Sequence, residues 1–292
     1  METSPSIFRG VSISTATTPW LPIGQLAPLV AAAGYSGIDI ACRPSVHDPA
    51  KPAGWGNNAA ILNLDAIETQ TPGFVTALRD HGLVCPVLLS YASADEVETV
   101  QRLAESARTL GAGALRLSLP LSDRESQRDA FLSQKSAWEN LIANEAFQDL
   151  RFLIETHDKT LCSSVSAALR IIGDLPMERT GVIYDVANTA VEGSEPIEVC
   201  LALLGAHLAG IHIKDIKARP DENRWNGLRF DHVPPGEGLI NWPAFMAALA
   251  RSGYRGWLTM ENFTGFELGP ERIVQDAAWL RALLGEQRDV SS

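Results

Sequence analysis

Cysteine is scarce in this sequence, and nothing in its spacing suggests pairing. The four residues are Cys42, Cys85, Cys162 and Cys200. They are far apart and form no C-x-x-C pair, so neither a zinc ribbon nor a disulfide framework is expected. The chain also lacks a basic start followed by an apolar stretch of signal-peptide length, and polar residues interrupt every longer apolar run. We therefore expect free thiols in a cytoplasmic protein that does not enter a membrane.

Positive charge is in deficit. Lys and Arg number 24 against 35 Asp and Glu, which leaves a formal net charge of -11. A surface that binds nucleic acid needs clustered Lys and Arg to contact phosphates, so DNA and RNA are not expected partners. With 292 residues, 46% of them hydrophobic, the chain is large enough to bury a substantial core.

Strand-like runs alternate with helical patterns along the chain. Strands are predicted at 8–13, 37–41, 83–89, 114–119, 151–155, 181–186, 209–213 and 256–260. Helices are predicted at 24–33, 72–81, 95–110, 126–147, 164–173, 195–205, 242–252 and 270–284. Strict alternation indicates parallel strands joined by crossover helices. Because there are eight strands and no glycine-rich phosphate turn follows the first, we expect one (β/α)₈ TIM barrel domain over residues 1–292, not an open sheet.

Two connections that leave the C-terminal ends of strands are unusually long. They cover residues 42–71 and 215–240. Barrel enzymes place their functional loops at this end of the strands. We expect both segments to form lids or pocket walls in which Trp55, Trp225 and Phe230 exclude water. The alternative is that they are surface excursions without a role in a site.

Acidic or imidazole side chains stand at the C-terminal ends of the last four predicted strands. They are Glu155, Asp185, His212 and Glu261. The same ends of parallel barrel strands share one face, so these side chains should meet there. Carboxylates placed together repel unless a cation or proton intervenes, and this ligand set suits a hard or borderline divalent ion. Taken singly, each carboxylate could instead cap a helix or pair with Arg, and the histidine could be a core residue.

Further candidates lie near the quartet. Lys214 should point to the same side of its strand as His212, and could stabilise an enediolate or protonate a leaving hydroxyl, or else pair with a carboxylate of the site. His157 could contact substrate hydroxyls or act as an acid, or else serve only as a hydrogen-bonding support. Weaker substrate-binding candidates at or beyond strand ends are Asn188, Arg43 and Trp55.

Six segments match a known family pattern: GYSGIDI (34–40), IETHD (154–158), YDVAN (184–188), IHIKDIK (211–217), PPGEGLINWPAF (234–245) and SGYRGWLTMEN (252–262). They resemble the sugar phosphate isomerase/epimerase family of xylose isomerase-like barrels, which includes ketose 3-epimerases and inosose dehydratases. The resemblance implies that the quartet binds one divalent ion, Mn²⁺, Co²⁺, Mg²⁺ or Zn²⁺. It also implies that Glu155 and Glu261 form an acid/base pair. Some ketose epimerases carry His where this chain has Asn188, and the HIKD and PGEG segments look more like inosose dehydratase.

The expected activity is that of a metal-dependent sugar isomerase or epimerase that removes an α-proton from a ketose or related polyol ketone. The metal would hold the enediolate that forms. Expulsion of a β-hydroxyl from the same species gives dehydration, so a lyase of inosose or 3-keto-sugar type is the alternative. A barrel that uses the ligands only for sugar binding or as a partner subunit is a further one.

A free sugar or cyclitol is favoured slightly over a phosphorylated one, because no phosphate-binding signature follows the seventh and eighth strands, but the sequence leaves both open. Endonuclease IV-like nucleases share this barrel type but need a histidine-rich multinuclear zinc site and a basic surface, and the chain has neither. The sequence leaves open whether the chain forms homo-oligomers.

Overall fold

A computed structural model of the protein describes residues 8–45, 47–120, 126–192, 195–224 and 226–289. Its parallel strands form a closed barrel, because the sheet runs in the order β1-β11-β8-β7-β6-β5-β4-β2 and β1 also pairs with β2. The eight strands are β1 (Gly10–Ser14), β2 (Gly37–Arg43), β4 (Val87–Ser90), β5 (Ala114–Arg116), β6 (Phe152–Glu155), β7 (Thr180–Asp185), β8 (Leu208–Ile213) and β11 (Trp257–Met260). The predicted (β/α)₈ barrel is confirmed.

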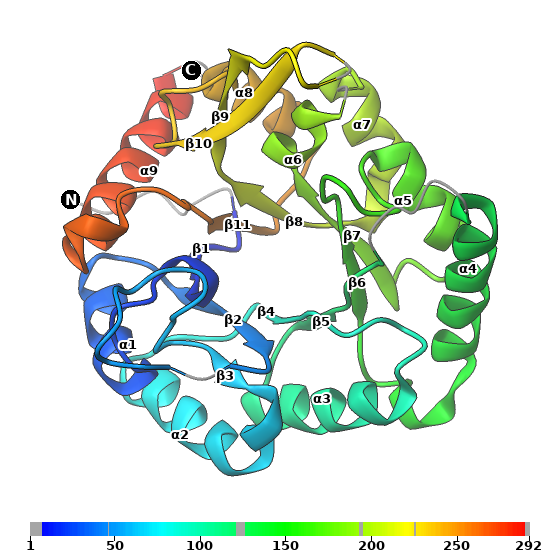
Figure 1. Ribbon diagram of the computed structural model, residues 1–292, viewed down its shortest axis with the longest axis horizontal. Coiled ribbons are helices and arrows are strands. Elements are labelled where there is room, and N and C mark those ends of the chain that lie inside the picture. The colour runs from blue at the N-terminus through cyan, green and yellow to red at the C-terminus, as the bar shows by residue number, and fades with distance from the viewer. Residues whose placement is uncertain (1–7, 46, 121–125, 193–194, 225, 290–292) are drawn as a thin grey trace.

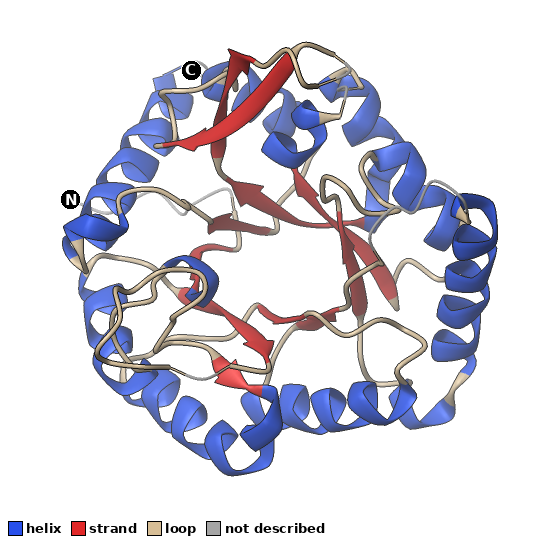
Figure 2. Ribbon diagram, in the orientation of Figure 1, coloured by secondary structure: helices blue, strands red, loops and turns tan. Residues whose placement is uncertain are grey.

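Helices surround the strands on the outside of the barrel (Figures 1 and 2). They are α1 (Ile23–Ala32), α2 (Ile67–Asp80), α3 (Val97–Leu110), α4 (Gln127–Ala143), α5 (Val165–Ile172), α7 (Ile197–Leu204), α8 (Trp242–Arg251) and α9 (Glu271–Asp289). One short helix, α6 (Val186–Val191), was not expected, since six residues are too few to show a helical period. The strand predicted from residue 83 begins at Val87, because Pro86 has no N–H and interrupts the ladder after the bridge at Val84.

Side chains of the strands alternate between two environments. Ile38, Ile40, Ile211 and Ile213 belong to the main hydrophobic core, which includes the helices around the barrel. A smaller interior cluster fills the lower part of the barrel, formed by Val87, Leu89, Ala114, Leu153 and Ile183. Higher up, toward the C-terminal ends of the strands, the interior becomes polar. The closed apolar floor therefore leaves one accessible face for chemistry.

The two long connections are more ordered than predicted. Residues 215–240 contain an antiparallel hairpin of β9 (Asp215–Pro220) and β10 (Leu228–Val233), which projects from the end of β8 (Figure 1). The 42–71 segment is shortened at both ends, since β2 runs to Arg43 and α2 begins at Ile67, with β3 (Leu62–Asn63) between them. The hairpin was not predicted, although charged and apolar residues alternate along β9 with the period of a strand. Trp225 lies outside the described residues.

Asp215 holds the base of this hairpin. Its carboxylate accepts hydrogen bonds from the backbone N–H groups of Gly236 (3.0 Å), Gly238 (3.2 Å) and Ile240 (3.2 Å) and from Trp242 Nε1 (3.0 Å). The approach requires glycine, because a Cβ on Gly238 would lie 2.0 Å from the Asp215 carboxylate, and Gly236 has φ +91°. The aspartate of IHIKD and the glycines of PGEG are thus one structural unit.

The described helices include none that is both long and apolar enough to cross a bilayer. All four cysteines are buried and free, as expected. The cytoplasmic location stays a prediction.

Replacing Asp215 should destabilise the protein. Asp215→Ala leaves five N–H donors without their acceptor, that of Ile216 included, so we expect the free energy of unfolding to fall by about 2–4 kcal/mol in a denaturant titration. The matched control is Asp231→Ala, which removes a partly exposed carboxylate paired with Arg219 on the same hairpin and should cost less than about 1 kcal/mol. Equal losses in the two variants would contradict the role assigned to Asp215.

Candidate metal centre

The four predicted ligands meet at the C-terminal mouth of the barrel. Glu155 and Asp185 end β6 and β7, His212 lies near the end of β8, and Glu261 directly follows β11. Asp185 and His212 are register partners on adjacent strands. All four side chains are buried, and one ligand atom from each lies within 4.8 Å of the others. The common face predicted from strand ends is therefore present.

One nitrogen of the imidazole faces all three carboxylates. His212 Nδ1 lies 3.1 Å from Glu155 Oε1, 3.3 Å from Glu261 Oε2 and 3.9 Å from Asp185 Oδ2. The other nitrogen, Nε2, has no hydrogen-bond partner within the described ranges. Three oxygens and one nitrogen thus converge on a single point, which is the donor set of a mononuclear divalent-metal site.

Two buried cations border the quartet. Lys214 Nζ lies 2.7 Å from Asp185 Oδ2 and 3.1 Å from Glu261 Oε2. Arg116 donates through Nη2 (2.6 Å) and Nε (3.0 Å) to Glu155 Oε2. Three carboxylates therefore face two fixed cations, which leaves one negative charge uncompensated when His212 is neutral. A buried charge of this kind is costly and favours an additional cation.

The pKa values of Asp185 and His212 reflect the same excess of negative charge. Burial, reinforced by Glu155 and Glu261, raises the pKa of Asp185 to about 6 against the opposing effect of Lys214. Burial alone would lower the pKa of His212, but Glu261 and Glu155 outweigh it and raise that pKa well above its usual value. Without a metal the surrounding carboxylates therefore favour the protonated form of His212. A divalent ion fits the site because it supplies the positive charge that this proton otherwise provides.

Two of the structural roles considered for the single carboxylates, helix capping and pairing with arginine, are compatible with the metal interpretation. Asp185 does cap the following helix, since its Oδ1 accepts the Asn188 backbone N–H at 2.9 Å, yet its Oδ2 faces Lys214 and the imidazole. Glu155 does pair with an arginine, yet its second oxygen faces His212. Asp185 and Glu155 each use one oxygen for support and turn the other toward the centre, whereas Glu261 Oε2 contacts both Lys214 and His212.

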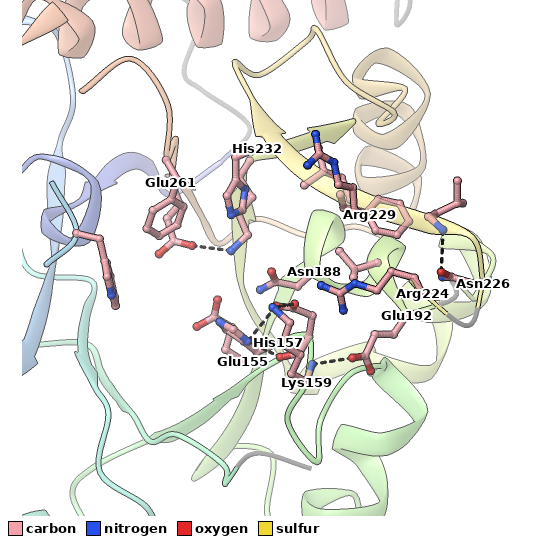
Figure 3. Close-up of a pocket in the computed structure, with 18 of the residues that line it drawn as sticks. Glu155, His157, Lys159, Asn188, Glu192, Arg224, Asn226, Arg229, His232 and Glu261 are labelled. Atoms are coloured by element: carbon pink, nitrogen blue, oxygen red, sulfur yellow. Dashed lines mark hydrogen bonds and ion pairs between the residues drawn. The ribbon is translucent and has the colours of Figure 1, made fainter. Parts of the chain in front are cut away.

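A cavity of about 700 Å³ opens above the quartet. An aromatic wall of Trp55, Tyr91 and Phe263 borders it, with Trp55 edge-on to Tyr91 (5.6 Å between centroids) and to Phe263 (5.7 Å). Figure 3 shows Glu155, Asn188 and Glu261 at one end of the cavity, and Arg224, Asn226 and Glu192 at the other. The cavity thus joins a charged inner end to a polar outer end formed partly by the hairpin.

The other predicted residues differ in their access to this cavity. His157, Asn188, Lys214, Trp55 and Phe230 line it, whereas Arg43 is not among its lining residues. The Arg43 guanidinium lies 4.6 Å from the Trp55 ring centroid and donates to the Trp55 carbonyl, so it supports the aromatic wall from behind. Asn188 Nδ2 donates to the Thr156 carbonyl (3.1 Å), and His157 Nδ1 hydrogen-bonds the Asp158 carbonyl (2.8 Å).

Sequence reasoning missed several residues of the site. Arg116 ends β5, but the strand was predicted to run to residue 119, which placed Arg116 in its middle and not at its end. Tyr91 and Phe263 lie in short loops just after β4 and β11, and His232, whose ring lies 5.3 Å from that of Phe263, comes from the hairpin. No sequence period marks these three positions.

Comparison with known proteins shows relatives of several activities. The chain is 32% identical to inosose dehydratase from Mesomycoplasma hyopneumoniae strain J over an aligned segment of 114 residues. This segment covers 36% of this chain and 38% of that protein. It is 24% identical over 244 residues to SgbU of Escherichia coli K12, provisionally named an L-ribulose-5-phosphate 3-epimerase, covering 77% of this chain and 83% of that protein. The chain thus spans little more than a third of the dehydratase.

Solved structures and a family model agree on the architecture. The structure of the IOLI protein with a bound zinc atom superposes with a TM-score of 0.73 at 16% identity, covering 95% of this chain and 98% of that one. The family model described as xylose isomerase-like TIM barrel matches residues 27–283. With its closed barrel and its buried Glu/Asp/His cluster, the protein belongs to the family of xylose isomerase-like TIM barrels.

Proposed function

We propose that the protein is a divalent-metal-dependent sugar isomerase or epimerase that removes an α-proton from a ketose or related polyol ketone. Its metal ligands are Glu155, Asp185, His212 and Glu261. The observation that carries the proposal is the buried quartet with one uncompensated negative charge at the inner end of a polar cavity. The named relatives, a cyclitol dehydratase and a protein provisionally named a sugar phosphate epimerase, support this class of substrate.

The residues around the cavity have different roles in the proposed reaction. A bound divalent ion supplies Lewis acidity, which lowers the pKa of a C–H group next to a carbonyl. Glu261 or Glu155 accepts that proton, and Lys214, 3.1 Å from Glu261, stabilises negative charge that develops on the neighbouring oxygen. The aromatic wall keeps bulk water from the reacting carbon. The substrate hydroxyls are held by His157 and Asn188, which line the same end of the cavity.

Dehydration is the second candidate, because the two glutamates are not equivalent. Arg116 donates twice to one oxygen of Glu155, whereas Glu261 lies beside Lys214, whose ammonium is an N–H acid. Epimerisation needs an acid/base group on each face of the carbon. Elimination needs one base together with an acid near the leaving hydroxyl, and Glu261 with Lys214 provides such a pair. The match to inosose dehydratase supports this alternative.

Loss of metal from ligand variants tests the site itself. Glu155→Ala and Glu261→Ala should each lower Mn²⁺ content below one tenth of the wild-type value after dialysis, measured by elemental analysis. The control is Glu192→Ala, which removes a carboxylate from the outer wall of the cavity and should keep the metal. If both ligand variants retain full metal content and activity, the ligand set is wrong.

Metal affinity should depend on pH with a defined sign. Below its pKa of about 6 Asp185 holds a proton, and His212 holds one to higher pH, so Mn²⁺ must displace protons to bind. We expect the dissociation constant to rise about tenfold or more for each pH unit below 6, measured by titration between pH 5 and pH 8. An affinity that is constant over this range would contradict the assignment of Asp185 as a ligand.

Solvent deuterium distinguishes the reactions. Incubation of the Mn²⁺-loaded protein with ketoses and cyclitol ketones in deuterated water should introduce deuterium at the α-carbon, detected by NMR. Glu261→Gln should slow the exchange at least about 100-fold, while Glu192→Gln should not. An inverted centre in the product indicates epimerisation, and loss of water indicates dehydration. Metal and sugar binding without any exchange would support the non-catalytic sugar-binding barrel instead.

A further inference from the structure

A polar layer lies inside the barrel next to the quartet. Ser12 Oγ and Thr259 Oγ1 are 2.9 Å apart, and Thr259 Oγ1 donates to Asp39 Oδ2 at 2.7 Å. All three residues are at most 2% exposed. Branched apolar side chains usually fill the interior of a barrel at this level, so a buried carboxylate is costly there unless it has a partner. The Thr259 hydroxyl engages only one of its oxygens, and the Ser12 hydroxyl bonds Thr259 in turn.

Two unpaired atoms in this region are complementary. Asp39 Oδ1, a hydrogen-bond acceptor, and His212 Nε2, which carries a proton in one neutral tautomer, are both buried, and neither has a hydrogen-bond partner in the part of the chain that the structure covers. Thr259, which holds Asp39, is the register partner of His212 on the adjacent strand. Side chains of register partners point to the same side of a sheet. Asp39 is therefore held on the same inner side as the imidazole.

The electrostatics agree with this placement. Burial raises the pKa of Asp39 to about 6, and the strongest opposing influence is His212, followed by the Thr259 hydroxyl and the Val87 backbone. His212 is thus close enough to Asp39 to act on its charge.

We propose that Asp39 is a positioning residue that accepts a hydrogen bond from the Nε2–H of His212, directly or through one bound water. A neutral imidazole carries a single N–H, so fixing it on Nε2 leaves the lone pair on Nδ1. That is the nitrogen which faces Glu155, Asp185 and Glu261. The inference rests on the metal site of the proposed function and is independent of which reaction follows.

The first test uses the wild-type protein and Zn²⁺ as probe. In full-length protein labelled with ¹⁵N at histidine and loaded with Zn²⁺, long-range ¹H–¹⁵N spectra should show His212 protonated at Nε2 and unprotonated at Nδ1. The Nε2 proton should exchange slowly with water. A His212 that is unprotonated at Nε2 would overturn the proposal, and this measurement does not depend on the folding of any variant.

The second test measures Zn²⁺ affinity by chelator competition. Asp39→Asn keeps the shape but removes the charge, and should raise the dissociation constant about 10- to 100-fold and speed exchange of the Nε2 proton. Ser12→Ala is the control, because it removes a hydrogen bond to the same Thr259 but no charge and no contact to Asp39, and should change affinity less than about threefold. Unchanged affinity in Asp39→Asn, or equal losses in both variants, would overturn the proposal. Failure of the wild type to bind Zn²⁺ would overturn the metal site as well.

Discussion

The surplus of buried negative charge at the mouth of the barrel is the constraint on which the other features of the site depend. Three carboxylates converge there on one imidazole nitrogen, and within the described residues Arg116 and Lys214 are the cations paired with them. Asp185 and Glu155 each keep one oxygen in a supporting contact and present the other to the centre. Such an arrangement is stable only while protons or a cation balance it. The fold therefore maintains a site whose negative charge must be balanced by protons or by a cation.

The features that make the family recognisable serve two different purposes. Glu155, Asp185, His212 and Glu261 belong to the centre itself. Asp215 and the glycines at 236 and 238 lie outside the quartet, yet they form an equally specific pattern, because a carboxylate that receives five N–H donors tolerates no Cβ at Gly238. A sequence motif shared with enzymes can therefore consist of residues that anchor a loop as well as residues that take part in catalysis.

The barrel and its quartet were predictable because both have a local signature. Alternating apolar runs and helical periods mark the strands and helices, and the strand-end position of an acid or histidine needs no knowledge of distant contacts. Tyr91, Phe263 and His232 had no such signature, since they meet the site only through the folding of loops and of the β9–β10 hairpin. Arg43 also stands at a strand end, but its guanidinium packs on the Trp55 ring and does not line the cavity.

The hairpin that reaches the outer end of the cavity is secured at its base by Asp215, one residue beyond Lys214. Its tip, with Arg224, Asn226 and Leu228, extends to the outer end without contributing to the quartet. Substitutions at the tip can therefore accumulate without disturbing the inner residues. This separation lets a lineage diverge in the compounds it accepts while its chemistry is inherited unchanged.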